Sequence, residues 1–164
     1  MLVLGIDPGY GIVGYGLVKS DIYGVYETID YGVITTPKED SITKRIETIY
    51  DAIDFLIKKY KPDFMSIEEL FFNTNLRTGI KVAQARGAIL LAGKKNNVPM
   101  YEYTPLQIKQ AITGHGRAEK KQMQLVVQSI LRLEKMPRPD DAADALAVAI
   151  CHLQTNNVIC SNEI

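Results

Sequence analysis

The sequence has few cysteines and histidines, and they lack the spacing of a disulfide framework or a zinc site. Cys151 and Cys160 do not form a CxxC pair, and His115 and His152 are not at metal-ligand spacing. We therefore expect both thiols to stay reduced. Long apolar runs are also missing: none approaches the roughly 20 residues of a membrane-spanning helix, and the first is interrupted at Asp7 with no basic segment before it. These absences predict a cytoplasmic protein without a membrane segment.

Net charge is also absent, because 19 lysines and arginines balance 19 aspartates and glutamates. This balance by itself gives no support to a nucleic-acid partner, since such proteins are usually basic. The distribution is nevertheless uneven. Between residues 76 and 121 only Glu102 and Glu119 oppose nine cations, which are Arg77, Lys81, Arg86, Lys94, Lys95, Lys109, Arg117, Lys120 and Lys121. Such a segment attracts phosphate, although cations on solvated helix faces give the same pattern.

The length of 164 residues and the hydrophobic content of 46% fit one domain that buries its own core. We expect this domain at residues 1–153 and a frayed polar tail at 154–164. Short β-branched or apolar runs bounded by Gly, Pro and Asp predict strands at 2–6, 11–19, 25–35, 63–67 and 98–103. Apolar residues at helical spacing predict helices at 41–60, 75–95, 105–112, 118–133 and 140–153.

This order of elements predicts an α/β fold with a mixed five-stranded sheet, in which three antiparallel strands precede two parallel ones and helices flank the sheet. The fourth strand follows a helix and can return parallel to the first by a right-handed crossover. In such sheets ligands bind beyond the carboxyl ends of the strands, near the switch in strand order. Asp7 and Glu68 follow the first and fourth strands directly. We therefore expect them side by side at that edge.

A second pair of carboxylates lies in the segment PDDAADALAVAI. Asp141 and Asp144 are three residues apart in the first turn of the expected helix, so their Cβ atoms lie on one face, about 5–6 Å apart. A helix N-terminus stabilises a negative group by only about 0.3–1 kcal/mol. Four carboxylates in one pocket therefore need a cation, and Mg²⁺ suits an all-oxygen site. Two such ions activate water and stabilise the leaving oxygen in phosphodiester hydrolysis.

These acidic residues also have structural explanations. Asp7 could be a turn former, Glu68 could lie on a solvated strand exit, and Asp140 is best explained as a helix cap. Their joint placement at element ends favours a site. Glu68 is preferred to Glu69 because adjacent strand residues point to opposite faces of the sheet. Asp141 is preferred to Asp140 because only Asp141 lies three residues before Asp144. Neither histidine has an obvious catalytic partner. His152 lies at a helix end and is expected to be structural, and His115 lies in a cation-flanked loop, where it could contact phosphate.

Five motifs follow one another along the chain: GIDPG with Asp7, SIEELFF with Glu68, QARG with Arg86, AEK with Lys120, and DAADALAVAICH with Asp141 and Asp144. From residue 5 to residue 152 this ordered set resembles the RuvC family, the bacterial Holliday-junction resolvases. The resemblance implies a ribonuclease-H-like fold, a homodimer, and nicking of two opposed strands of a four-way DNA junction during recombination and repair. It implies Mg²⁺ as cofactor, with two ions per site and Mn²⁺ as a substitute, and RuvA and RuvB as partners.

By motif position, the resemblance makes Asp7, Glu68, Asp141 and Asp144 the catalytic carboxylates and metal ligands. It implies DNA contacts at Phe71, Lys109 and Lys120, with the two lysines on phosphate in the active site, and the cationic middle segment adds Lys81, Arg86, Arg117 and Lys121 as expected DNA contacts. Phe71 would stack on a junction base, a contact worth about 1–3 kcal/mol; if it is a core residue, Phe72 takes that place. The small residues of helix 75–95 suit a two-fold dimer contact, or packing within the monomer.

Three other functions stay open. An actin-like ATPase or sugar kinase would also place an aspartate at a glycine-rich hairpin, but this chain is short for two such lobes and lacks a second glycine-rich phosphate turn. A junction-binding protein without catalysis would bind through its cations alone and would not need the carboxylates. A nuclease of the same fold that cuts RNA or an RNA–DNA hybrid would use the same metal chemistry.

Overall fold

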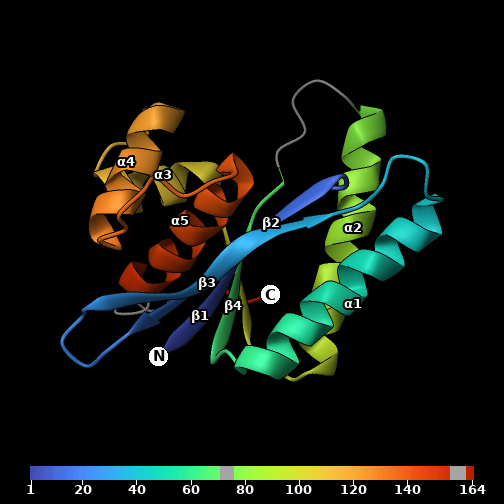
Figure 1. The fold of residues 1–164 in the computed structure, drawn as a ribbon, viewed down its shortest axis with the longest axis horizontal. Coiled ribbons are helices and arrows are strands. Elements are labelled where there is room, and N and C mark those ends of the chain that lie inside the picture. The colour runs from blue at the N-terminus through green and yellow to red at the C-terminus, as the bar shows by residue number, and fades with distance from the viewer. Residues whose placement is uncertain (71–75, 156–161) are drawn as a thin grey trace.

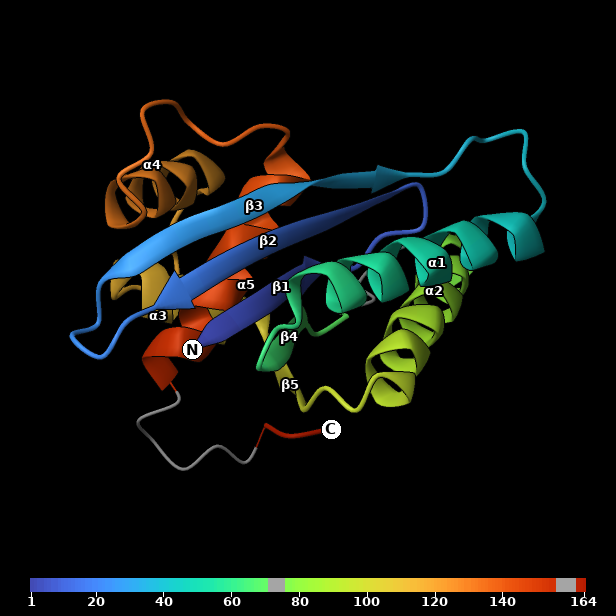
Figure 2. The same ribbon diagram turned by 60° about the horizontal axis from the view of Figure 1, so that its bottom comes forward.

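The computed structural model of the chain describes residues 1–70, 76–155 and 162–164. Five strands form one sheet in the order β3-β2-β1-β4-β5. β1, β2 and β3 are antiparallel, whereas β4 is parallel to β1 and β5 is parallel to β4 (Figure 2). The predicted mixed sheet is confirmed. The strands are β1 (Leu2–Asp7), β2 (Ile12–Ser20), β3 (Tyr26–Thr35), β4 (Phe64–Glu68) and β5 (Met100–Tyr103).

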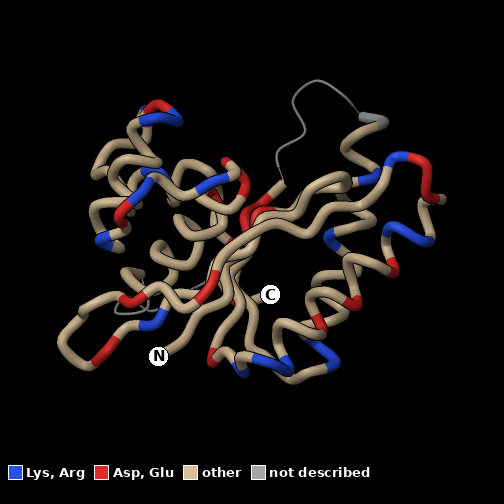
Figure 3. Tube along the Cα trace, in the orientation of Figure 1, with Lys and Arg blue, Asp and Glu red and all other residues tan. Residues whose placement is uncertain are grey.

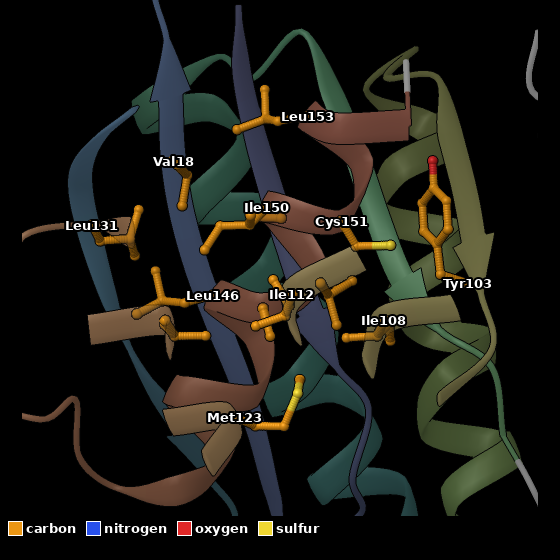
Figure 4. Close-up of a cluster of buried hydrophobic side chains, with 14 of the residues drawn as sticks. Val18, Tyr103, Ile108, Ile112, Met123, Leu131, Leu146, Ile150, Cys151 and Leu153 are labelled. Carbon is orange, nitrogen blue, oxygen red and sulfur yellow. The ribbon is translucent and has the colours of Figure 1, made fainter. Parts of the chain in front are cut away.

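Helices cover both faces of the sheet, so the molecule has three layers (Figure 1). One face carries α1 (Ile42–Tyr60) and α2 (Leu76–Lys95), and the other carries α3 (Pro105–Thr113), α4 (Lys120–Ile130) and α5 (Asp140–Thr155). Alternate residues of β1 belong to two separate cores: Leu4 and Ile6 pack under α1 and α2, and Val3 packs with α5. The second core joins α3, α4 and α5 to the sheet (Figure 4). No helix of the described residues is long and apolar enough to cross a membrane.

Helix α5 lies directly on the backbone of β1 and β2, because both strands carry glycine where they face it. A methyl group at Gly5 would overlap the carbonyl oxygen of Ala145, and one at Gly14 would overlap that of Asp141. One at Gly16 would lie 2.9 Å from the Cα of Leu146. The helix itself contributes small side chains to this contact, and its alanines are buried. Sheet and helix therefore approach more closely than larger side chains would allow.

Local sequence signals explain several helix ends. The Ser41 hydroxyl accepts a hydrogen bond from the Lys44 amide at the start of α1. Thr104 and Gln107 form a reciprocal capping box at the start of α3, with proline as the first helical residue. Gly114 ends α3 in the left-handed conformation, with φ of 73°. These caps satisfy backbone groups that have no partner inside a helix.

The main differences from the predicted elements lie in the last third of the chain. Helix α4 is shorter at both ends than predicted, and α5 continues to Thr155 instead of ending at residue 153. Residues 162–164 are paired, although we expected a frayed tail: the Glu102 amide donates to the Asn162 carbonyl at 2.9 Å, and the Ile164 amide donates to the Met100 carbonyl at 3.0 Å. The unpaired backbone groups of an edge strand favour such pairing.

Replacing Gly5 with alanine should destabilise the protein, because the methyl group would overlap the Ala145 carbonyl and lie 2.6 Å from the Ala149 amide nitrogen. Overpacking of this kind costs about 3 kcal/mol of the free energy of unfolding, which equilibrium urea unfolding would measure. Gly32→Ala is the matched strand control, since its methyl group would meet only the movable end of the Tyr15 side chain. Equal losses at the two positions would contradict this prediction.

Candidate active site

Asp7 and Glu68 are brought together by strand pairing. Ile6 of β1 pairs with Ile67 of β4 in parallel register, so the next residue on each strand reaches the same edge of the sheet. Alternation along the strands turns both carboxylates toward α5. Ser66, two residues before Glu68, confirms this facing, because its hydroxyl donates to the Val148 carbonyl of α5 at 3.2 Å. The predicted side-by-side placement is confirmed.

The first turn of α5 supplies the other two carboxylates. The glycine contact described above holds the backbone of Asp141 against Gly14, which pairs with Asp7 in the β1–β2 register. Asp144 lies one turn further and borders a pocket that Glu68 also lines. Acidic positions accordingly gather where the end of β4 meets the start of α5 (Figure 3). The four predicted carboxylates therefore come from three elements to one end of the sheet.

The electrostatics of this site oppose four ionised carboxylates. Burial, followed by repulsion from Glu68, Asp144 and Asp141, raises the pKa of Asp7 from 3.8 to about 8. Burial, followed by repulsion from Asp144, raises the pKa of Glu68 to about 7. Burial is also the main cause that raises the pKa of Asp144, although Lys120 acts against it. The protein alone therefore does not balance the negative charge of this site.

Two lysines lie beside the carboxylates. Lys109 of α3 and Lys120 of α4 line the same pocket as Glu68 and Asp144, and apolar side chains of α3, α4 and α5 form the remainder of its wall. The Lys120 ammonium lies 3.3 Å from an Asp144 oxygen. Both lysines act to lower the pKa of Glu68. The pocket thus combines acidic groups with cations that can hold a phosphate.

The donor chemistry of the four carboxylates fits a hard divalent cation, since every donor is an oxygen. Burial and then mutual repulsion raise the pKa values of Asp7 and Glu68, and such a cation would offset the repulsion. As they stand, no three His, Cys, Asp or Glu side chains in the described residues are arranged to hold one metal ion. The residues therefore fit a metal by their chemistry and common location, whereas its coordination stays a prediction.

The other predicted DNA contacts are spread over the molecule. Lys81 of α2 lies 5.5 Å from the ring of Tyr10, in the loop that follows Asp7. Arg117 and Lys121 are exposed near the start of α4. Arg86 is only 19% exposed and forms an ion pair with Glu102, which joins α2 to β5. Its contact with DNA stays a prediction beside this structural role.

Three further predictions concern residues in loops or in the core. Phe71 and Phe72 fall outside the described residues. His115 is exposed, and its backbone amide donates to the Thr113 hydroxyl at 3.2 Å. His152 lies in the core: its Nδ1 is 2.8 Å from the hydroxyl oxygen of Tyr103, and burial lowers its pKa to about 4. This position agrees with the structural role expected for it.

Sequence reasoning missed an arginine that supports the loop after Asp7. Arg45 of α1 is buried; its Nε donates to the Thr36 hydroxyl at 2.8 Å and its Nη2 to the Tyr10 carbonyl at 3.2 Å. Its guanidinium also lies 3.6 Å from the centre of the Tyr10 ring. The signal was a charged residue four positions before Ile49, on the apolar face of the helix.

Comparison with known proteins agrees with this geometry. The family model of "Crossover junction endodeoxyribonuclease RuvC" matches residues 3–152. The chain belongs to the RuvC family. It is 57% identical over 155 residues to the RuvC of Fusobacterium nucleatum, covering 94% of this chain and 81% of that protein. It is 52% identical over 158 residues to the RuvC of Clostridioides difficile, covering 96% and 93%.

Solved structures of the RuvC family extend this likeness to three dimensions. Thermus thermophilus RuvC superposes with a TM-score of 0.93 at 34% identity, over 100% of both chains. The same protein in complex with a Holliday junction substrate gives a TM-score of 0.91 at 30% identity, again over 100% of both chains. The yeast mitochondrial resolvase Ydc2, with a TM-score of 0.68 at 13% identity over 93% of this chain and 78% of its own, shares the fold. The predicted ribonuclease-H-like fold and family membership are confirmed.

The Asp7→Asn variant should be more stable than the wild type at pH 8 without divalent metal. Between an unfolded pKa near 3.8 and a folded pKa of about 8, the folded wild type holds a proton that the unfolded chain has lost, so its stability falls as pH rises. An uncharged amide removes this dependence. Thermal unfolding with chelator should show a gain of about 10 °C at pH 8 and about a third of that at pH 5, which is closer to the unfolded pKa. The same difference at both pH values would contradict the raised pKa.

Proposed function

We propose that this chain is a Holliday-junction resolvase, a structure-selective endonuclease that nicks two opposed strands of a four-way DNA junction by metal-dependent phosphodiester hydrolysis in homologous recombination and repair. Membership of the RuvC family supports the reaction and the substrate. The observation that carries the proposal is the set of four carboxylates at one end of the sheet, beside two lysines in a shared pocket. Residues 1–153 would act as one nuclease domain.

Asp7, Glu68, Asp141 and Asp144 would hold Mg²⁺, with two ions per site and Mn²⁺ as a substitute. When bound, the metal lowers the pKa of the attacking water and stabilises the leaving oxygen. Asp7 and Glu68 must lose their protons to serve as ligands, because their pKa values are raised to about 8 and about 7. Metal binding should therefore release protons and strengthen as pH rises.

Lys109 and Lys120 would hold the scissile phosphate against the carboxylates. They border the pocket on the side of α3 and α4, where the substrate phosphate can replace their present acidic neighbours. Arg117 and Lys121 extend this positive surface at the start of α4. On the opposite side of the carboxylates, Lys81 near the loop after β1 would contact the DNA backbone. Phosphate contacts of this kind orient the DNA and make binding salt-dependent.

The remaining parts of the proposal concern the aromatic residues that precede α2 and the outer surface of α2. Phe71 would stack on a base at the opened crossover, with Phe72 as the alternative. Helix α2 would form the contact of a homodimer: Ile80 and Leu91 on its outer surface are each 53% exposed, and a methyl group at Gly87 would meet no atom within 4 Å. An apolar groove between α2 and α1 continues this surface. A two-fold dimer would present two active sites to a two-fold junction.

RuvA and RuvB would be the partners of the dimer in a cytoplasmic pathway that moves and then resolves the junction. This part of the proposal rests on family membership. The proposed reaction itself needs only the dimer, the metal and the four-way junction.

The proposed reaction predicts that the protein nicks a four-way DNA junction in opposed strands, with Mg²⁺ and not with chelator. Matched linear duplex and RNA–DNA hybrid should be cut at least about a hundredfold more slowly, because they do not present two strands to the two sites of a dimer. Denaturing gels of labelled strands would measure each rate. Equal cutting of linear duplex, or cutting in chelator, would reject a metal-dependent resolvase, and preferred cutting of the hybrid would favour an RNA-directed nuclease.

Asp7→Asn is expected to bind the junction but not to nick it, with a cleavage rate lower by about a hundredfold or more because a ligand of the metal is lost. Gel-shift titration would measure binding, and single-turnover cleavage would measure the rate. Retained cleavage would remove Asp7 from the catalytic set. Loss of binding together with cleavage would instead assign Asp7 to DNA binding.

Leu91→Glu is expected to weaken the dimer, since it places a charge in the apolar surface of α2. We expect the dimer dissociation constant to rise about tenfold or more in sedimentation equilibrium. Phe55→Glu is the matched control, because Phe55 is an apolar residue of α1 that is 61% exposed and lies outside the α1–α2 groove. A larger effect of Phe55→Glu would move the proposed interface from α2 to α1.

A further inference from the structure

Lys120 has two acidic partners, and they face different surroundings. Its ammonium lies 3.3 Å from an oxygen of Asp144 and 3.4 Å from an oxygen of Asp140. Asp144 belongs to the carboxylate site and borders the pocket. Asp140 is the first residue of α5 and lies toward α4, outside the residues whose charges raise the pKa of Asp7 or Glu68. One partner of Lys120 is therefore a proposed metal ligand, and the other is not.

Asp140 is itself held in place from α4. Gln124 lies one helical turn after Lys120, is only 7% exposed, and donates from Nε2 to Asp140 Oδ1 at 2.9 Å. The other oxygen, Oδ2, faces the lysine. Arg138 approaches Oδ1 more distantly, at 3.9 Å, from an exposed position. The carboxylate is thus fixed by a buried amide on one oxygen, and its second oxygen is directed at Lys120.

We propose that Asp140, held by Gln124, is a positioning residue. It keeps the Lys120 ammonium at the edge of the pocket when Asp144 binds metal and no longer pairs with the lysine. This inference rests on the proposed nuclease function. A lysine side chain has several rotatable bonds, and ordering it costs conformational entropy. Lys120 is 57% exposed, so packing alone does not hold it. A fixed carboxylate beside the pocket reduces the freedom that the lysine must lose when it contacts phosphate.

This arrangement also gives the two adjacent aspartates separate roles. The backbone of Asp141 lies against Gly14 of the sheet, and its charge is among the causes, after burial, that raise the pKa of Asp7, whereas the Asp140 side chain contacts α4. Asp140 was expected to be a helix cap. In the structure its side chain instead links the start of α5 to α4 through Gln124 and Lys120. The loss of Asp140 should therefore act mainly through Lys120, because all four proposed metal ligands remain and Asp144 loses only one of two neighbouring aspartates that repel it.

The first test measures how accessible Lys120 is without DNA and with saturating Mg²⁺, the condition in which Asp144 would be bound to metal and could no longer hold the lysine. Limited acylation with an N-hydroxysuccinimide ester, followed by mass spectrometry, gives the labelling rate of each lysine. Asp140→Ala should raise the rate at Lys120 about threefold, and Gln124→Ala should raise it less, because the carboxylate remains but is free to move. Asp140→Asn should lie between Asp140→Ala and the wild type, since the amide oxygen still accepts from one neighbour.

The second test is a double-mutant cycle on junction cleavage under single-turnover conditions with saturating enzyme and Mg²⁺. Asp140→Ala should lower the rate about fivefold with the junction dissociation constant unchanged, and Lys120→Ala should lower it more. In the Lys120→Ala background, removal of Asp140 should change the rate less than about twofold, because the group that it positions is gone. A merely structural role would lower the rate equally in both backgrounds.

Asp54 provides a matched control far from the pocket. It accepts from Lys58 Nζ at 2.6 Å and from Asn96 Nδ2 at 2.8 Å, so it repeats the pairing of an aspartate with a lysine and an amide. Asp54→Ala should raise the labelling of Lys58 and leave junction cleavage unchanged.

Two kinds of failure are distinguishable. Unchanged Lys120 labelling in Asp140→Ala, or equal rate losses with and without Lys120, would overturn the positioning role while the nuclease function stands. A wild-type protein that does not nick junctions would overturn the proposed function itself, and the labelling result would still report whether Asp140 holds the lysine.

Discussion

The contact between α5 and the glycines of β1 and β2 determines how the site is assembled. Gly5, Gly14 and Gly16 leave the strand backbone uncovered, and the helix lies on it with alanine-sized side chains between. This close approach places the first turn of the helix beside the carboxyl ends of β1 and β4. Larger side chains at these positions would lift Asp141 and Asp144 away from the sheet. The glycines that allow the helix to pack on the sheet are therefore also the residues that set the position of the carboxylates.

The same approach makes the site electrostatically costly. Asp7 and Glu68 are partly removed from water and face like charges, so their pKa values rise to about 8 and about 7. Lysines from α3 and α4 offset part of this charge, and a divalent cation would offset more. The carboxylates at this end of the sheet thus destabilise the fold, and the two hydrophobic cores on the faces of the sheet offset that loss of stability. In the proposed resolvase, metal and DNA phosphate would share this charged pocket.

Much of the fold and site was predictable because the signals are local or periodic. Alternation and strand ends placed Asp7 and Glu68 at one edge, and helical spacing paired Asp141 with Asp144. The roles of Arg45, Arg86 and Asp140 were not predictable, because each depends on a partner distant in sequence: Thr36 and Tyr10, Glu102, and Gln124. The pairing of residues 162–164 with β5 was missed for the same reason, since a short polar tail has no periodicity of its own.

The sequence by itself determined the order of strands and helices, the positions of the four carboxylates at element ends, and the family that these motifs resemble. These properties follow from hydrophobic periodicity, turn residues and motif order, which a single chain carries directly. Only the tertiary structure decided which charged groups meet. Asp140 contacts Lys120 and Gln124, and Arg86 contacts Glu102, because helix packing sets the distances between side chains of different elements. Pairwise electrostatics depend on those distances and on burial, which one-dimensional spacing does not encode.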